Sequence, residues 1–284
     1  MSEATRASAH SQARPHRRAA ATGQAAFVLH RWDWSESSLI LDLFTRESGR
    51  VAVAAKGAKR PYSQLRSVLL PFQRVQVQFG RTRGEQAADV HTLRGAEWVG
   101  PAIALAGADW FAGFYVNELL MRLLARDDPH PRLFDAYALA LAAMSRAPAA
   151  RVEAALRAFE LMLLRETGVL PELDCATLTQ QQVVAERCYQ LRPEEGLVDA
   201  APGAGALTGE ACRALEAALR ATLANATADS LDALLAAAQA AGPALKAQLR
   251  QLLHYHLAGA TLRTREVMID AYRVLGLDAG AATR

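Results

Sequence analysis

Apolar and polar residues alternate in short runs from Gln24 onward. The alternation is clearest where Val75, Val77 and Phe79 are separated by single polar residues. A two-residue period places successive side chains on opposite faces of a strand, so the apolar ones turn toward a core. Four further runs are short, β-branched or aromatic in part, and bounded by turn residues. In chain order the five runs read AAFVLHR, SLILDLFT, VAVAAKG, RVQVQFG and AADVHTLR.

Five short strands in close succession predict a small closed or nearly closed barrel. Between the third and fourth lies PYSQLRSVLLPF, bounded by Pro61 and Pro71, where an extended loop or a short helix fits. Five strands with such an insertion match the OB-fold, a barrel whose exposed strand face and loops often bind single strands of nucleic acid. We therefore predict an N-terminal OB-fold β-barrel over residues 23–100.

After Pro101 the apolar positions change to the spacing of amphipathic helices. Three runs predict a helical bundle: ALAGADWFAGFYVNELLMRLLAR, PRLFDAYALALAAMSR and ARVEAALRAFELMLLRETG. Residues 172–206 are interrupted by Pro and Gly, which predicts an irregular subdomain with a short hairpin. The fold class is therefore α+β, with the barrel followed by a mainly α-helical domain over residues 101–284. Its later helices are expected at about 209–223, 230–241, 243–258 and 264–275.

Positive charge is concentrated in the first part of the chain. The 284 residues carry a net charge of +3, with 51% hydrophobic and 21% charged residues, as in a folded protein. Residues 1–100 hold 15 Lys and Arg against 8 Asp and Glu, a net +7, which leaves 17 against 21, a net −4, for residues 101–284. Residues 1–22 are rich in Ala, Ser and Arg and predict a disordered basic tail rather than a targeting signal. A polyanionic partner is thus expected to bind the first part of the chain.

The stretch 50–83 contains eight Lys and Arg and neither Asp nor Glu. A sheet face with fixed positive charge attracts a polyanion, and nucleic acid is the commonest one. The alternative is a solvated strand face that happens to be basic. On the first interpretation the candidate DNA-binding residues are Arg50, Lys56, Lys59, Arg60, Arg66, Arg74, Arg81 and Arg83.

Four aromatic residues in or beside this stretch are candidates for stacking on bases. One such contact contributes about 1–3 kcal/mol by alanine substitution. A place in the core or as a plug of the barrel is the alternative for each. The four are Trp32, Trp34, Tyr62 and Phe72.

Signals for catalysis, metal binding and membrane insertion are missing from the sequence. It has no Gly-rich phosphate loop, no H-E-x-x-H, no G-x-S-x-G and no dinucleotide-binding fingerprint. Cys175, Cys188 and Cys212 form no C-x-x-C pair, which predicts reduced thiols in a cytoplasm and no zinc site. His254 and His256 point to different sides of a helix, and no apolar run reaches the roughly 18 residues that span a bilayer. We therefore expect no enzymatic activity, no cofactor and no metal.

Ordered segments along the chain carry a resemblance to a known family. In the first part they are AFVLHRWDWSESSLILDLFTRESGRVAVAAKGAKR, QLRSVLLPFQRVQVQF and TLRGAEWV. In the second part they are FYVNELLMRLL, PRLFDAY, RAFELMLLRETGVLPELDCA and LRTREVM. In this order they resemble the RecO family of bacterial recombination mediators, over roughly residues 24–275.

The resemblance implies an OB-fold joined to an α-helical domain, without catalytic turnover. It implies that the protein binds single- and double-stranded DNA, anneals complementary strands and, with RecR, helps to load RecA onto DNA coated by single-strand binding protein. Its place would be the cytoplasm, in association with the nucleoid. Some members carry a four-cysteine zinc site, but here Cys175 is followed only by Cys188 and Cys212 at other spacings.

The resemblance also implies that the helical domain binds the acidic, hydrophobic-ended tail of single-strand binding protein. Such a peptide needs an apolar pocket with Arg at its rim. In the matching helices the candidates for this rim are Arg122 and Arg157. The alternative for each is an ordinary solvated helix residue. Two alternatives are an OB-fold RNA-binding or translation-related module and a nucleic-acid-processing enzyme. The enzyme needs carboxylates or a metal near the basic face, which the acid-free stretch 50–83 disfavours.

Overall fold

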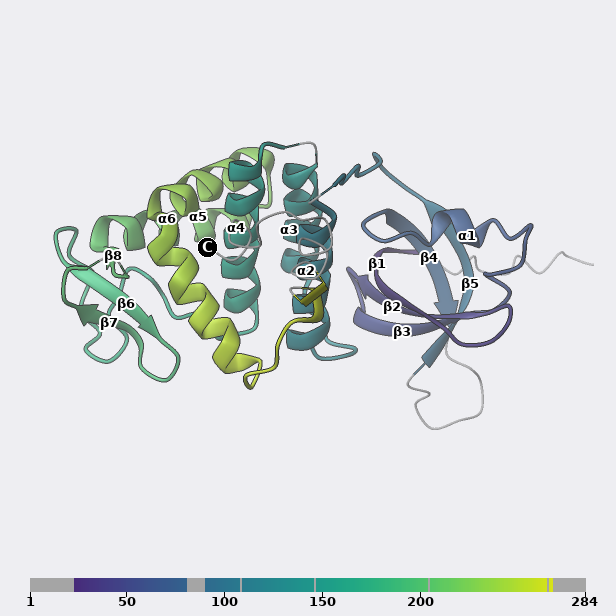
Figure 1. Ribbon diagram of the computed structural model, residues 1–284, viewed down its shortest axis with the longest axis horizontal. Coiled ribbons are helices and arrows are strands. Elements are labelled where there is room, and N and C mark those ends of the chain that lie inside the picture. The colour runs from purple at the N-terminus through teal and green to yellow at the C-terminus, as the bar shows by residue number, and fades with distance from the viewer. Residues whose placement is uncertain are drawn as a thin grey trace, which may run out of the picture.

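The fold combines a β-barrel with a helical domain that carries a small sheet on the side away from the barrel. In Figure 1 the barrel lies at the right, the helices occupy the middle and the sheet is at the far left. The predicted α+β class, with an OB-like barrel followed by helices, is confirmed. The computed structural model describes residues 23–80, 90–107, 109–145, 147–203, 205–264 and 266–267.

Five strands close the barrel in the order β1-β2-β3-β5-β4. All neighbours are antiparallel except β3 and β5, which run parallel. The alternating positions form the barrel's own core, in which Val51, Val53, Val75 and Val77 are buried. The strands are β1 (Gln24–Asp33), β2 (Leu39–Thr45), β3 (Gly49–Ala55), β4 (Arg74–Gly80) and β5 (Val90–Trp98), with the short helix α1 (Leu65–Val68) in the predicted insertion.

The described part of the helical domain contains five long helices. Two predicted helices, 230–241 and 243–258, form one run that is kinked at Gly242, where φ is 56°. The kink follows from Pro243, which cannot continue the hydrogen-bond ladder, and from a glycine that tolerates positive φ. The predicted helix 264–275 falls largely outside the described residues. The helices are α2 (Asp109–Leu123), α3 (Pro131–Met144), α4 (Ala149–Glu166), α5 (Gly209–Ala224) and α6 (Ala228–His256).

A three-stranded sheet packs against the end of the helical domain. Its order is β7-β6-β8, with β6 (Cys188–Arg192), β7 (Gly196–Ala200) and β8 (Leu207–Thr208). Strands β6 and β7 form an antiparallel hairpin. Tyr189 and Leu191 of β6 are buried in the same core as the helices. The sheet is therefore part of the helical domain rather than a separate unit.

Aromatic side chains join the barrel to the helices. The side chains of Phe27 and Phe44 point out of the barrel and are buried in the core of the helical domain. The centres of the Phe27 and Tyr137 rings are 4.9 Å apart, and those of Phe44 and Phe134 are 5.4 Å apart. These spacings are typical of favourable aromatic pairs. The barrel thus packs directly on α3.

A bulge in β1 provides a second attachment. The register with β2 shifts between Val28 and His30, and the carbonyl of Leu29 accepts a hydrogen bond of 2.9 Å from the side-chain amide of Asn117 on α2. The Asn117 oxygen in turn accepts a 2.6 Å bond from the Tyr137 hydroxyl. Burial raises the pKa of Tyr137, so this hydroxyl remains a donor.

No helix within the described part of the chain combines the length and apolar character needed to cross a membrane.

Candidate nucleic-acid interface

One end of the barrel is shaped by two connecting segments that hold each other. The Lys59 amide donates to the Ser37 carbonyl at 3.0 Å, and the Gly57 amide donates to the Ser38 hydroxyl at 3.4 Å. The Lys59 ammonium donates to the Ser35 carbonyl at 3.0 Å and lies 3.2 Å from Asp33 Oδ1. The segment after β3 is therefore fixed against the β1–β2 loop before any ligand binds.

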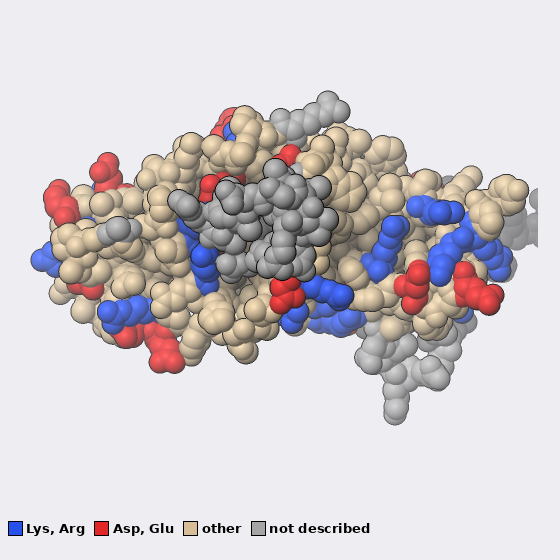
Figure 2. Space-filling model, viewed as in Figure 1, with Lys and Arg blue, Asp and Glu red and all other residues tan. Residues whose placement is uncertain are grey.

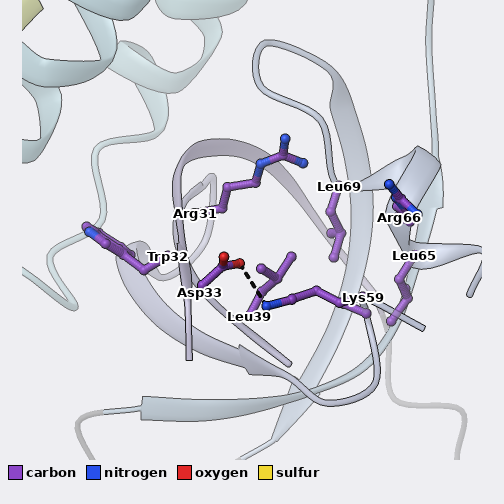
Figure 3. Close-up of a pocket in the computed structure, with 9 residues that line it drawn as sticks. Arg31, Trp32, Asp33, Leu39, Lys59, Leu65, Arg66 and Leu69 are labelled. Atoms are coloured by element: carbon purple, nitrogen blue, oxygen red, sulfur yellow. Dashed lines mark ion pairs between the residues drawn. The ribbon is translucent and has the colours of Figure 1, made fainter. Parts of the chain in front are cut away.

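These segments enclose a hollow of about 600 Å³. Arg31, Lys59 and Arg66 contribute cationic groups to its lining, with the Asp33 carboxylate beside Lys59. Figure 3 shows Trp32 and Arg66 on opposite sides of the hollow and the ion pair between Asp33 and Lys59. The apolar part of the lining consists of Leu39, Ala58, Leu65 and Leu69.

Exposed cations surround this end of the barrel. Within the described residues, Lys56, Arg60 and Arg66 form no ion pair, and all three are exposed. Figure 2 shows blue side chains gathered over the barrel at the right, with red groups beside some of them. Unpaired cations around a concave, partly apolar surface fit a ligand that carries both phosphates and bases.

Arg50 does not belong to this surface. Its Nε and Nη2 donate to the buried carboxylate of Asp42 at 2.9 and 2.8 Å, and its side chain is only 14% exposed. Its Nη1 donates to the carbonyls of Met121 and Leu124, which lie at the C-terminal end of α2, where a positive charge is favourable. The guanidinium donates to groups inside the protein, so Arg50 joins the barrel to the helices and does not line the hollow.

One further predicted arginine, Arg74, lies away from the hollow. Arg74 is exposed, but its guanidinium carbon is 5.8 Å from the centre of the Phe134 ring on α3, and it does not line the hollow. Arg81 and Arg83 fall outside the described residues. The structure therefore brings together Lys56, Lys59, Arg60 and Arg66 from the predicted set.

Arg31 was missed by the sequence analysis, although it lines the hollow. Arg31 lies before the acid-free stretch 50–83 in the sequence. The closed barrel brings it next to Lys59 and Arg66 of that stretch. The interleaved aromatic and basic residues of HRWDW were the available signal.

The four aromatic candidates divide into two groups. Trp32 and Trp34 are exposed, and Tyr62 is 99% exposed. Phe72 is instead 2% exposed and adopts a φ of 67°, which is strained for a residue with a side chain. Its ring packs against Phe114 at 4.9 Å, so Phe72 is a core residue and not a free stacking surface.

The two arginines predicted to bind a partner differ in accessibility. The Arg157 side chain is 12% exposed and lies 2.6 Å from Oε1 of the buried Glu160, which also accepts a 2.6 Å bond from the Tyr115 hydroxyl. Burial raises the pKa of Glu160. The Arg122 side chain is 47% exposed and lies 3.6 Å from Glu118. Arg122 is therefore accessible from solvent, whereas Arg157 is occupied within the domain.

A metal site is not found among the residues that the structure describes, where no three His, Cys, Asp or Glu side chains gather. Cys212 is buried, and burial raises the pKa of its thiol to about 12. A thiol with this pKa stays protonated at neutral pH.

Comparisons with known proteins cover nearly the whole described chain. The model for the family Recombination protein O N terminal matches residues 21–102, and that for Recombination protein O C terminal matches residues 107–266. The two matches therefore include the barrel with its hollow and the helices with the small sheet.

Curated relatives agree with the family models. The DNA repair protein RecO of Variovorax paradoxus (strain S110) is 50% identical over 253 residues, which cover 87% of this chain and 95% of the relative. The DNA repair protein RecO of Delftia acidovorans (strain DSM 14801 / SPH-1) is 49% identical over 249 residues, covering 87% and 95%. That of Polaromonas naphthalenivorans (strain CJ2) is 46% identical over 250 residues, covering 88% and 96%. The chain therefore belongs to the RecO family of proteins of DNA repair and recombination.

Proposed function

We propose that this protein is a non-enzymatic recombination mediator that binds DNA at the barrel-end hollow and anneals complementary strands. With RecR it helps to load RecA onto DNA coated by single-strand binding protein. The observation that supports the DNA site is the preformed hollow with a cationic rim and an apolar lining. Its action on DNA associates the protein with the nucleoid in the cytoplasm.

The proposed annealing needs charge neutralisation and no bond chemistry. Two complementary strands repel each other through their phosphates, and each neutralised phosphate releases counterions. Lys56, Arg60 and Arg66 are exposed and without ion pairs in the described chain, so they are available for phosphates. Contacts of this kind carry no sequence information, which suits a protein that acts at any gap or break.

Single and double strands use the hollow differently in this proposal. An unpaired base can enter the apolar lining or stack on an exposed ring such as Trp34 or Tyr62. A duplex keeps its bases paired and contacts only the cations at the rim. The same surface therefore binds both forms and holds the single strand with additional contacts.

The helical domain has a different partner in this proposal. Arg122 lies exposed on α2, where it is available to the acidic, hydrophobic-ended tail of single-strand binding protein. A charge-assisted hydrogen bond is the contact expected between the guanidinium and the carboxylates of such a tail. Capture of the tail would place the barrel next to the coated strand.

The DNA site is tested by removing the three unpaired cations together, as Lys56→Ala, Arg60→Ala and Arg66→Ala. The slope of log affinity against log salt for single-stranded DNA should flatten by about 2, because each phosphate contact contributes about 0.7. The matched control removes three exposed arginines that are ion-paired in the helical domain: Arg151, Arg187 and Arg192. An equal change of slope in both triple variants would refute a DNA site at the barrel end.

A further inference from the structure

A second hollow, of about 400 Å³, lies between the barrel and α2. Three aromatic rings contribute to its lining: Phe72, Trp110 and Phe114. The Trp110 ring centre is 5.8 Å from that of Phe72 and 5.7 Å from that of Phe114. Trp110 is nevertheless 44% exposed. The helical domain thus presents an aromatic surface to solvent beside the barrel.

Close packing fixes the rings behind Trp110. A Cβ on Gly113 would lie 2.6 Å from Leu105 Cδ1 and 2.8 Å from Phe72 Cε1. Real side chains do not approach so closely, so Phe72 reaches α2 only because Gly113 has no side chain. The second hollow is therefore preformed, and a ligand would not have to open it.

The two hollows share one residue, Arg31, which lines both. His30 also lines the second hollow, and no carboxylate does. Burial lowers the pKa of His30. The charge of Asp42 raises this pKa, and the charges of Arg263 and Arg31 lower it further. Arg263 is held near α2 because its amide donates to Glu118 at 2.9 Å. The second hollow therefore combines exposed aromatic surface with positive charge at its edge.

We infer that a single strand bound at the barrel end continues past Arg31 into the second hollow, where a base stacks on Trp110. The inference builds on the proposed DNA binding and adds a part of the helical domain to the DNA site. The shared Arg31 supplies a phosphate contact between the two hollows, and the absence of carboxylates from the second lining suits an anionic chain. A duplex cannot follow this path, because its bases are paired.

The test compares oligonucleotides that differ in length. Binding of labelled dT4, dT12 and a 12-base-pair duplex is measured by fluorescence anisotropy at low salt with the full-length protein. Trp110→Ala should weaken dT12 binding at least about fivefold, the lower limit for one stacked base, and leave dT4 and the duplex within about twofold. The matched control is Trp98→Ala, since Trp98 is 54% exposed and lines neither hollow.

A second variant covers the chance that Trp110→Ala disturbs packing. Leu70 lines the second hollow and is 41% exposed, so Leu70→Glu places a negative charge there without removing a buried side chain. It should also weaken dT12 binding and spare dT4. Leu178→Glu, at a site that is 68% exposed and lines neither hollow, is its control.

The possible outcomes distinguish failure of the extended path from failure of the proposed DNA binding. Wild-type protein that binds neither oligonucleotide would overturn both. Normal dT4 binding, with dT12 binding unchanged in Trp110→Ala and Leu70→Glu, would overturn the extended path alone. The path would also be overturned if both variants lost binding of an acidic, hydrophobic-ended peptide while dT12 affinity stayed at the wild-type level. The hollow would then belong to a peptide.

Discussion

Arg60 and Arg66 at the barrel end and Arg165 and Arg220 in the helical domain show two uses of one side chain. The first two are exposed and form no ion pair within the described residues. Arg165 donates to both oxygens of the buried Glu216, at 2.9 and 2.7 Å, and Arg220 Nε lies 2.7 Å from the same carboxylate. Arg165 joins α4 to α5 and Arg220 pairs with Glu216 within α5, whereas the two arginines of the barrel remain available to a ligand.

The difference teaches that a buried carboxylate, and not the local density of cations, decides what an arginine does. Asp42 is fully buried on β2 and binds Arg50, although Arg50 opens a stretch that contains no acid. Cations without such a partner remain around the barrel-end hollow. A count of charges along the sequence cannot make this distinction, because it does not show which charges meet.

The largest effect on stability is expected for Arg50, the arginine of the basic stretch that pairs with a buried carboxylate. Arg50→Ala should lower the free energy of unfolding by about 3–5 kcal/mol, because among the described residues it leaves the buried Asp42 charge with Arg126, at 3.3 Å, as its one ion-pair partner. Urea denaturation measures the loss. The salt slope of DNA binding should not change in the folded variant.

Arg46 provides the control for Arg50, because it also joins the barrel to α3, through Asp135 at 2.9 Å, but in an exposed pair. Arg46→Ala should cost less than about 1 kcal/mol. Equal destabilisation by the two substitutions, or a flatter salt slope for Arg50→Ala, would erase the contrast between internal and free arginines.

A second effect concerns Glu118, which holds the segment after α6 against α2. Burial raises the pKa of Glu118, but hydrogen bonds from Thr264 and Arg263 outweigh it and leave the pKa lowered. The stabilisation is therefore complete above the unfolded-state pKa of about 4.3 and is lost as the pH falls through the lower folded-state value. Glu118→Gln should lose about 1.5–3 kcal/mol at neutral pH.

The pH dependence of unfolding by urea tests this assignment. The difference in stability between wild type and Glu118→Gln should shrink as the pH falls below about 4.3. Glu36→Gln, an exposed change in the β1–β2 loop, controls for the loss of one negative charge. A difference that stays constant down to acid pH would show that the carboxylate charge is not what holds the segment.

A third effect separates Arg122 from Arg157. Arg122→Ala should weaken binding of an acidic, hydrophobic-ended tail peptide at least tenfold, since a charge-assisted contact contributes about 1.5–3 kcal/mol. Arg157→Ala should lower stability instead, because Arg157 pairs with the buried Glu160. Peptide anisotropy and urea denaturation distinguish the two results.

Annealing assays extend this prediction to function. Arg122→Ala should slow annealing of strands coated by single-strand binding protein and leave annealing of naked strands nearly intact, because naked strands never require the tail contact. Equal loss on both would mean that the surface around Arg122 lies on the DNA path.

The fold could be predicted further than the site because its signals are local. The alternation around Val75 and the helical spacing after Pro101 reflect the periods of single elements. The role of Arg50 depends on how the end of α2 packs against β3. The spacing of apolar residues within one helix or strand does not contain this information. The second hollow likewise depends on α2 and the barrel together: Phe72 and Trp110 are far apart in the sequence, yet their rings meet.

The smallest change in stability is expected at Arg60, ten residues after Arg50 in the same basic stretch. Arg60 is exposed and has no ion pair in the described chain, so Arg60→Ala should alter the free energy of unfolding by less than about 0.5 kcal/mol. The salt slope for single-stranded DNA should nevertheless flatten by about 0.7, the contribution of one phosphate contact. Arg50→Ala should show the reverse: a large loss of stability and no change of slope. Measured side by side, the two variants test whether burial against a carboxylate separates structural from DNA-binding arginines, and an unchanged slope in Arg60→Ala would remove Arg60 from the interface.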